Sequence, residues 1–205
     1  GAGRAARLEV IEATRRSLSL RSTGEVVEEV PPGAPGSRLA QLEIGLSLPK
    51  PGRAEDMVDR LTQLGVARLQ PLVFQRSPDH ARKWTGARME KLQRAGREAM
   101  KQCLRLWPVE IGSPLSPLEW LDPDRSTLVL DPRAPMELLP TLATLSAPRN
   151  LRLMIGPEGG FSPKELEALR GAGAIPVALR GHVLRIETAA ELGAGLILQS
   201  VRSEG

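Results

Sequence analysis

The segment from residue 151 to residue 166 constrains the fold more than any other part of the chain. Residues 151–155 are mostly apolar, as a buried strand is, and they lead into the turn Gly156-Pro-Glu-Gly-Gly160. A helix start follows, with Ser162 as the N-cap, Pro163 at the first helical position and Glu165 completing a capping box. Phe161 and Leu166 occupy the hydrophobic-staple positions. A buried strand therefore ends in a glycine turn and enters a firmly capped helix, which is where open α/β sheets bind ligands.

This glycine turn admits three interpretations. Its glycines would let the backbone approach a ligand closely, but the same sequence suits a tight strand-to-helix connection that binds nothing. A phosphate site is a further option, because a helix N-terminus attracts anions, although Glu158 inside the turn argues against it. A second element, residues 179–189, contains Gly181 and then Arg185 and Glu187 at another helix start. Arg185 could pair with Glu187 or hold a nucleic-acid phosphate, whose geometry a guanidinium matches.

Apolar strands alternate with amphipathic helices from residue 42 onward, which predicts an α/β domain with a mainly parallel sheet over residues 42–205. The expected strands are residues 42–48, 66–74, 109–111, 126–130, 151–155 and 174–179, and the expected helices are residues 53–64, 81–106, 135–145 and 188–201. Residues 1–41 contain two short β segments, 8–11 and 17–20, followed by a Pro/Gly-rich loop at residues 31–36. So short a segment cannot bury a large core, so we expect it to be a small β domain or part of one.

Basic charge is concentrated in one stretch. The chain carries a net charge of +4, yet residues 76–105 hold nine Lys or Arg residues against three acidic ones, which makes that stretch +6 and the remainder −2. Such clustering is typical of a face that binds nucleic-acid phosphates.

Several residue types are scarce, which excludes whole classes of site. With only His80 and His182 a multi-histidine metal site is excluded, and no metal is expected. Neither a GxxxxGK[ST] loop nor a GxGxxG turn occurs, and the absence of Tyr argues against an aromatic platform for base stacking. Cys103 is the only cysteine, there is no signal-peptide pattern, and no apolar run is long enough to span a membrane. These features predict a cytoplasmic protein without a membrane anchor.

Two C-terminal motifs resemble those of the RsmE-type small-subunit (16S) rRNA uracil-N3 methyltransferases, a family of the SPOUT superfamily. They are Leu153-Met-Ile-Gly-Pro-Glu-Gly-Gly-Phe-Ser162 and Leu184-Arg-Ile-Glu-Thr-Ala189. Weaker matches precede them in order, at residues 50–53, 63–66, 71–76, 98–105 and 130–134. The resemblance covers residues 42–200. The chain departs from the family pattern at Arg180 and Leu104, which stand where the family has glycines, and at His182, which replaces an arginine.

This resemblance implies a trefoil-knotted domain preceded by a partial PUA-like β-barrel domain at residues 1–41 that binds RNA. It also implies S-adenosyl-L-methionine as cofactor, cradled by the backbone of three loops. The cofactor-binding residues would be Leu130, Asp131, Pro132, Ile155, Gly156, Pro157, Glu158, Gly159, Gly160, Leu179, Gly181, Val183, Leu184, Thr188 and Ala189. Arg185 is the first candidate to stabilise the uracil anion, followed by Arg133 and Arg105, with Glu158 or Glu187 as base.

The expected partners are small-subunit ribosomal RNA and a second copy of the chain. Lys50, Arg53, Arg76, Arg94, Arg97, Lys101 and Arg105 are the expected RNA-binding residues. The closing helix, residues 188–201, is apolar nearly all round, so it should be buried on more than one face, as at a homodimer interface. Two alternatives remain: a non-catalytic RNA-binding or ribosome-assembly protein with a decayed cofactor site, and a nucleotide-binding enzyme that uses the glycine turn for phosphate.

Overall fold

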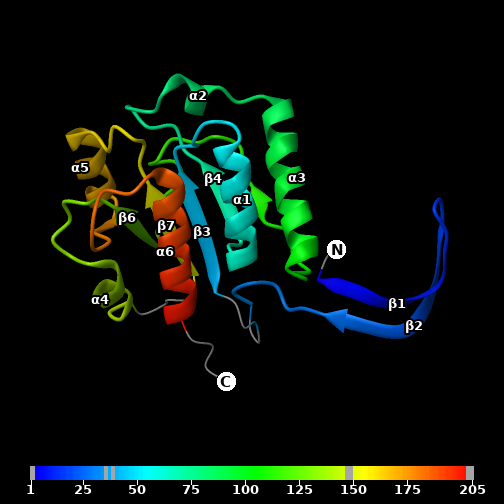
Figure 1. Ribbon diagram of the computed structural model, residues 1–205. Helices are drawn as coiled ribbons and strands as arrows, with labels where there is room; N and C mark the ends of the chain where they lie inside the picture. The colour runs from blue at the N-terminus through cyan, green and yellow to red at the C-terminus, as the bar shows by residue number, and fades with distance from the viewer. Residues whose placement is uncertain (1–2, 35–36, 38–39, 146–149, 202–205) are drawn as a thin grey trace.

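The computed structural model describes residues 3–34, 37, 40–145 and 150–201, which form a six-stranded sheet with helices on both faces and a separate hairpin (Figure 1). The sheet is parallel throughout, in the order β5-β4-β3-β7-β6-β8, which confirms the predicted α/β class. Its strands are β3 (Gln41–Leu46), β4 (Arg68–Pro71), β5 (Glu110–Ile111), β6 (Ser126–Leu130), β7 (Asn150–Ile155) and β8 (Ile175–Val177). The helices are α1 (Arg53–Leu64), α2 (Asp79–Arg82), α3 (Gly86–Gln102), α4 (Leu138–Leu142), α5 (Pro163–Gly171) and α6 (Ile186–Ser200).

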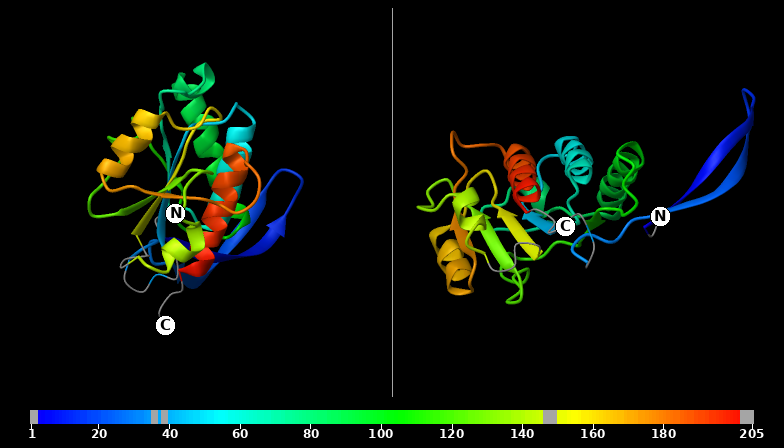
Figure 2. Two further views of the ribbon diagram at one scale, coloured as in Figure 1. Left: turned by 90° about the vertical axis from the view of Figure 1, so that its left-hand side faces the viewer. Right: turned by 90° about the horizontal axis from the view of Figure 1, so that it is seen from below.

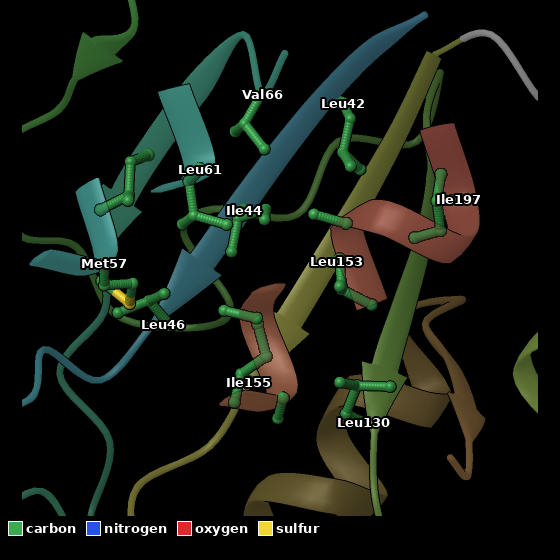
Figure 3. Packing of buried hydrophobic residues seen from close by; sticks show 14 of the residues in the cluster. Leu42, Ile44, Leu46, Met57, Leu61, Val66, Leu130, Leu153, Ile155 and Ile197 are labelled. Carbon is green, nitrogen blue, oxygen red and sulfur yellow. The ribbon is translucent and has the colours of Figure 1, made fainter. Parts of the chain in front are cut away.

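The two faces of the sheet carry separate apolar clusters, because side chains alternate along each strand. Helices α1, α3 and α6 lie side by side on one face, and α5 covers the other (Figure 2). Alternate residues of β3 and β7 point toward α1 and α6. Figure 3 shows this cluster, with Leu42, Ile44, Leu46, Leu153 and Ile155 facing Met57, Leu61 and Ile197.

Helix α6 lies close to the sheet because a glycine faces β7. A Cβ added to Gly193 would stand 2.6 Å from Cδ2 of Leu153, so only a glycine fits without a shift. Ala190, Ala194 and Ile197 on the same side of the helix are fully buried. The C-terminal helix is thus seated on the strands that end at the glycine turn.

The N-terminal strands β1 (Arg4–Ala13) and β2 (Leu18–Glu28) form an antiparallel hairpin that extends away from the sheet (Figures 1 and 2). Both strands are longer than expected from the sequence. Contacts at the base of the hairpin include Glu29, whose main-chain oxygen accepts a hydrogen bond from Nε1 of Trp107 at 2.7 Å and whose Oε2 accepts one from the Leu106 amide at 2.7 Å. Along the hairpin, Leu8, Val10, Leu20 and Val26 are about half exposed, so most of its apolar surface faces solvent.

The predicted and observed bounds of the helices and strands agree best where a capping residue or a sharp stop marks the end of the element. Helix α1 and strand β6 match their predicted bounds at both ends. The prediction of one long helix over residues 81–106 was wrong: the chain is extended at Lys83, and Thr85 caps a new helix, its hydroxyl accepting a hydrogen bond from the Arg88 amide at 3.2 Å. The helix predicted at residues 135–145 is limited to α4, because the chain before it is extended and Glu137 pairs with Ala178.

Part of the predicted loop at residues 31–36 lies outside the described residues. Among the described helices, none combines the length and apolar character that crossing a membrane requires.

Candidate functional site

Three neighbouring strands end at one point on the edge of the sheet. Leu130, near the end of β6, pairs with Ile155 on one side and with Val177 on the other. The loops that follow these strands begin at residues 131, 156 and 178, so the segments predicted to hold a cofactor leave the sheet side by side. The first and third also contact each other directly, because the Asp131 amide donates to the Val177 oxygen at 3.0 Å and the Leu138 amide to the Ala178 oxygen at 3.0 Å.

The glycine turn has the conformation that its residues predict. Gly160 has φ of +66°, in the left-handed region, and its amide donates to the Pro157 oxygen at 2.8 Å. Gly156 lies against the Phe161 ring, and a Cβ there would stand 2.9 Å from that ring. Phe161 is itself buried and makes an edge-on contact with Phe74, with ring centroids 5.3 Å apart. The turn is therefore built against a fixed apolar base.

The capping box predicted for the next helix is present in full. Oγ of Ser162 accepts a hydrogen bond from the Glu165 amide at 3.2 Å, and Oε2 of Glu165 accepts one from the Ser162 amide at 2.9 Å. The other carboxylate oxygen of Glu165 accepts a hydrogen bond from the Gln75 amide at 2.6 Å. This second contact, which joins the helix start to the loop after β4, could not be predicted from the sequence.

The Arg76 side chain reaches the glycine turn, although the sequence placed it among the RNA-binding residues. Its Nη1 donates to the main-chain oxygens of Gly159 at 3.0 Å and Phe161 at 3.3 Å. Part of its charge is therefore directed at the protein's own backbone.

The loop after β6 presents one cation to solvent. Asp131 is buried, and its Oδ1 accepts a hydrogen bond from the Arg133 amide at 3.0 Å, while the Arg133 side chain is 77% exposed. An open hollow of about 530 Å³ lies between this loop and α5, lined by Asp131, Arg133, Pro163, Leu166, Glu167 and Arg170. Of the residues that line this hollow, only Asp131 and Arg133 belong to the three loops predicted to bind the cofactor, so the hollow does not by itself mark a cofactor site.

Arg185 is the N-cap residue of α6 and is exposed. The pairing with Glu187 that the sequence allowed does not form, because Glu187 lies 3.6 Å from Nη1 of Arg53 on α1. Across the described ranges the Arg185 side chain has no hydrogen-bond or ion-pair partner. A cation at a helix N-terminus is opposed by the helix dipole, so this arginine does not serve the stability of α6.

The two departures near this loop are both on the surface. Nε of Arg180 lies 2.6 Å from Oε2 of Glu137, and this contact raises the pKa of Arg180. His182 and Val183 are exposed, and Gly181 between Arg180 and His182 has φ of +106°. The residue that replaces a family glycine is thus tied to the loop after β6.

Arg105 is not where the sequence placed it. It is 8% exposed and donates to the main-chain oxygens of Thr62 at 3.1 Å and Val66 at 2.7 Å, and burial lowers its pKa. Those oxygens lie at the end of α1 and before β4, at the opposite edge of the sheet from the glycine turn. Arg105 is therefore bound to the main chain at the end of α1, away from the glycine turn, and this placement argues against the roles predicted for it in catalysis and RNA binding.

The other predicted RNA-binding residues are exposed. Arg94, Arg97 and Lys101 follow one another at helical spacing on α3, where Lys101 also pairs with Glu98 at 2.9 Å. Lys50 and Arg53 lie at the start of α1, the helix that packs against α3. In the part of the chain that the structure describes, no three His, Cys, Asp or Glu side chains are grouped so that they could hold a metal ion.

Comparison with known proteins agrees with this geometry. The model of the family described as "RNA methyltransferase domain" matches residues 36–197. The ribosomal RNA small subunit methyltransferase E of Mycobacterium bovis is 32% identical over 96% of this chain and 75% of its own length. Among solved structures, a methyltransferase of Legionella pneumophila in complex with S-adenosylmethionine has a TM-score of 0.79 and 23% identity, over 98% of this chain and 80% of its own.

The small subunit methyltransferase E of Neisseria gonorrhoeae, also bound to S-adenosylmethionine, has a TM-score of 0.76 and 19% identity, over 97% of this chain and 80% of its own. At these identities the two structures establish the fold alone. The family model covers most of the chain, and the mycobacterial relative is matched over three quarters of its length. The chain with this glycine turn therefore belongs to the RNA methyltransferase domain family, among the relatives named ribosomal RNA small subunit methyltransferase E.

Proposed function

We propose that this chain transfers the methyl group of S-adenosylmethionine to N3 of a uracil in small-subunit ribosomal RNA. The observation that carries the proposal is the meeting of three loops at adjacent strand ends, next to an arginine without a partner. Family membership supports the reaction class. The choice of uracil N3 rests on the resemblance of the two C-terminal motifs.

The residues present suit this cofactor. Residues 156–160 offer mainly main-chain groups, and Gly159 in this turn is exposed, so its backbone is accessible to a ligand. Phe161 occupies the space that a side chain at Gly156 would need. Loops at residues 130–133 and 179–189 would complete the cradle from the neighbouring strands. When bound, S-adenosylmethionine supplies a methyl group on a sulfonium centre, so the protein's task is to position the acceptor and stabilise charge.

Uracil N3 must lose its proton before it can accept a methyl group. Arg185 is the best-placed cation to stabilise the resulting anion, because it lies within the 179–189 loop and has no competing carboxylate. Arg133, on the neighbouring loop, is a second candidate. Glu158 is exposed within the glycine turn and is our candidate base; Glu187 is less suited, since Arg53 already faces it.

The target uracil must be unpaired or flipped out, because base pairing hides N3. We assign the RNA backbone to the exposed face of α3 with Arg94, Arg97 and Lys101, together with Lys50 just before α1 and Arg53 at its first position. A ribosomal substrate and a single unpaired cysteine both favour action in the cytoplasm.

The test is nucleoside mass mapping after the protein, S-adenosylmethionine and unmodified small-subunit rRNA are incubated together. We expect one N3-methyluridine per RNA. Methylation of a ribose or of another base would mean that the specificity was transferred wrongly from the family. Cofactor binding without RNA, measured by calorimetry, separates this function from the non-catalytic alternative, because a decayed site would bind neither S-adenosylmethionine nor its demethylated product.

We also propose that the active unit is a homodimer formed through α6. Leu192 is 41% exposed, Leu196 and Leu198 are only partly buried, and a Cβ at Gly195 would meet nothing within 4 Å. An apolar helix with one open side suits a second copy of itself. Light scattering should give a dimeric mass, and mixing Gly159→Val with Arg185→Ala should restore activity if each site draws on both chains.

Two features of architecture complete the proposal. The chain after β8 would be knotted: it leaves beside the 131–138 loop and crosses to α6, on the opposite face from α5. The hairpin β1–β2 would belong to a PUA-like domain that contacts RNA. Its apolar residues share one side of the hairpin: Ala6 pairs with Val26, Val10 pairs with Leu20, and Leu8 lies between them on β1. An apolar side of this kind is what a barrel strand turns toward the barrel interior.

A further inference from the structure

The loop after β4 crosses one strand to reach the glycine turn. β4 and β7 are separated by β3 in the sheet, yet residues 74–76 contact the turn and the start of α5. These contacts are of three kinds: the Phe74 ring against Phe161, the Gln75 amide on Glu165, and the Arg76 guanidinium on two main-chain oxygens. So dense a connection indicates that the position of one loop depends on the other.

The loop itself is held in place by a second arginine. Arg82 donates through Nε to the Ser77 oxygen at 2.9 Å, and through Nη2 to the oxygens of Phe74 at 3.0 Å and Gln75 at 2.7 Å. The Ser77 hydroxyl accepts a hydrogen bond from the Phe74 amide at 2.9 Å. Arg76 is therefore presented from a rigid support.

Two peptide planes of the turn are fixed at both ends by these contacts. In the peptide that joins Gly159 to Gly160, the Gly159 oxygen accepts a hydrogen bond from Arg76, and the Gly160 N–H donates to the Pro157 oxygen. In the peptide that joins Phe161 to Ser162, the Phe161 oxygen accepts a hydrogen bond from Arg76, and the Ser162 N–H donates to the Glu165 carboxylate. Because glycine adopts positive and negative φ almost equally, a turn with adjacent glycines would otherwise sample several peptide orientations.

We propose that Arg76 is a positioning residue for the cofactor: it holds the Gly159 and Phe161 oxygens so that the backbone of the glycine turn is ordered before the cofactor binds. The inference rests on the proposed function of that turn. It replaces the phosphate contact that the sequence predicted for Arg76. Ordering the turn in advance removes a conformational cost that binding would otherwise meet.

The test compares Arg76→Met and Arg76→Lys with Lys83→Met, which removes one exposed charge from the same basic stretch. S-adenosylmethionine affinity is measured by calorimetry without RNA, together with amide exchange in residues 156–162. Loss of the charged donor should weaken cofactor binding in Arg76→Met by about tenfold, or about 1.4 kcal/mol. Arg76→Lys, with a single donor group of shorter reach, should fall between Arg76→Met and wild type. Lys83→Met should bind the cofactor like wild type.

Exchange of the turn amides should accelerate in Arg76→Met but not in Lys83→Met, with the melting temperature of each variant checking for global unfolding. Unchanged cofactor affinity with weakened RNA binding would identify Arg76 as a phosphate contact and overturn the inference. If Arg76→Met fails to fold, wild-type affinity in a folded Arg76→Lys would also overturn it. If wild type binds no cofactor, the proposed function fails, and exchange alone then decides whether Arg76 orders the turn.

Discussion

Leu104 is held in a conformation that suits glycine, and replacing it should stabilise the protein. It follows the C-cap of α3 with φ of +60°, and among the described residues no other non-glycine has a positive φ. The Arg105 amide donates back to the Met100 oxygen at 3.1 Å, which is the hydrogen bond of a Schellman motif. In that motif the residue at the position of Leu104 is usually glycine, because a Cβ is strained there.

The magnitude follows from three effects. A left-handed conformation costs a non-glycine residue about 1–2 kcal/mol, which Leu104→Gly would recover. The greater freedom of glycine in the unfolded chain costs about 0.4–1 kcal/mol. Little packing is lost, since Leu104 is 83% exposed. The net gain should be about 0.5–1 kcal/mol, or a rise of about 1–4 °C in melting temperature for a chain of this size.

Chemical denaturation of wild type, Leu104→Gly and Leu104→Ala measures this gain. The alanine variant is the control, because it removes the exposed side chain but keeps the strained Cβ, so its free energy of unfolding should stay within about 0.5 kcal/mol of wild type. If the glycine variant were no more stable than the alanine variant, Leu104 would not be strained in solution and the reasoning would be wrong.

Four further predictions concern Arg105 and three residues of the candidate site. Arg105→Met should lower the free energy of unfolding by about 1–3 kcal/mol, because two main-chain oxygens lose a charged donor, while calorimetry shows unchanged cofactor affinity; a stable but inactive variant would restore its catalytic role. Ser162→Ala should cost about 1 kcal/mol in denaturation experiments through loss of the α5 cap, and a cost near zero would contradict the capping box. Gly159→Val should abolish measurable cofactor binding, because a branched side chain would block the close approach of the cofactor to the turn backbone, although its Cβ would make only an ordinary contact with Arg76 at 3.4 Å; wild-type affinity would remove the turn from the site. Arg185→Ala should reduce turnover by about 10²-fold or more with little change in cofactor affinity, whereas equal losses in both would mark it as structural.

The features that the sequence predicts best are those fixed by neighbouring residues. The cap at Ser162 and the stop of α1 at Gly65 depend on groups within a few positions, and each forms as expected. The break between α2 and α3 was missed because the helical pattern of apolar residues continues through it. Thr85 and the following Gly86 offered a local signal, but neither residue inside a helical pattern is enough on its own to place a cap.

Contacts between loops are beyond this kind of reasoning, because a side chain's partner depends on which strands are neighbours. Nothing near residue 76 in the sequence shows that β4 lies one strand away from β7. Arg76 therefore looks the same as Arg94 in the sequence, although the first holds backbone oxygens and the second faces solvent. The strand order, rather than the local pattern, assigns their roles.

The same point changes how the basic stretch should be interpreted. The clustered charge of residues 76–105 predicts a face that binds phosphates. Four arginines of this stretch instead donate to main-chain oxygens: Arg76 at the glycine turn, Arg82 within its own loop, Arg88 at Pro49, and Arg105 at the end of α1. α1 has no basic residue in its own last turn, so Arg105 supplies the cation that a helix C-terminus favours. Guanidinium groups are suited to this use, since they keep their charge while bonding several oxygens. The charge that remains for RNA is therefore narrower than the sequence implies and lies mainly along the exposed face of α3.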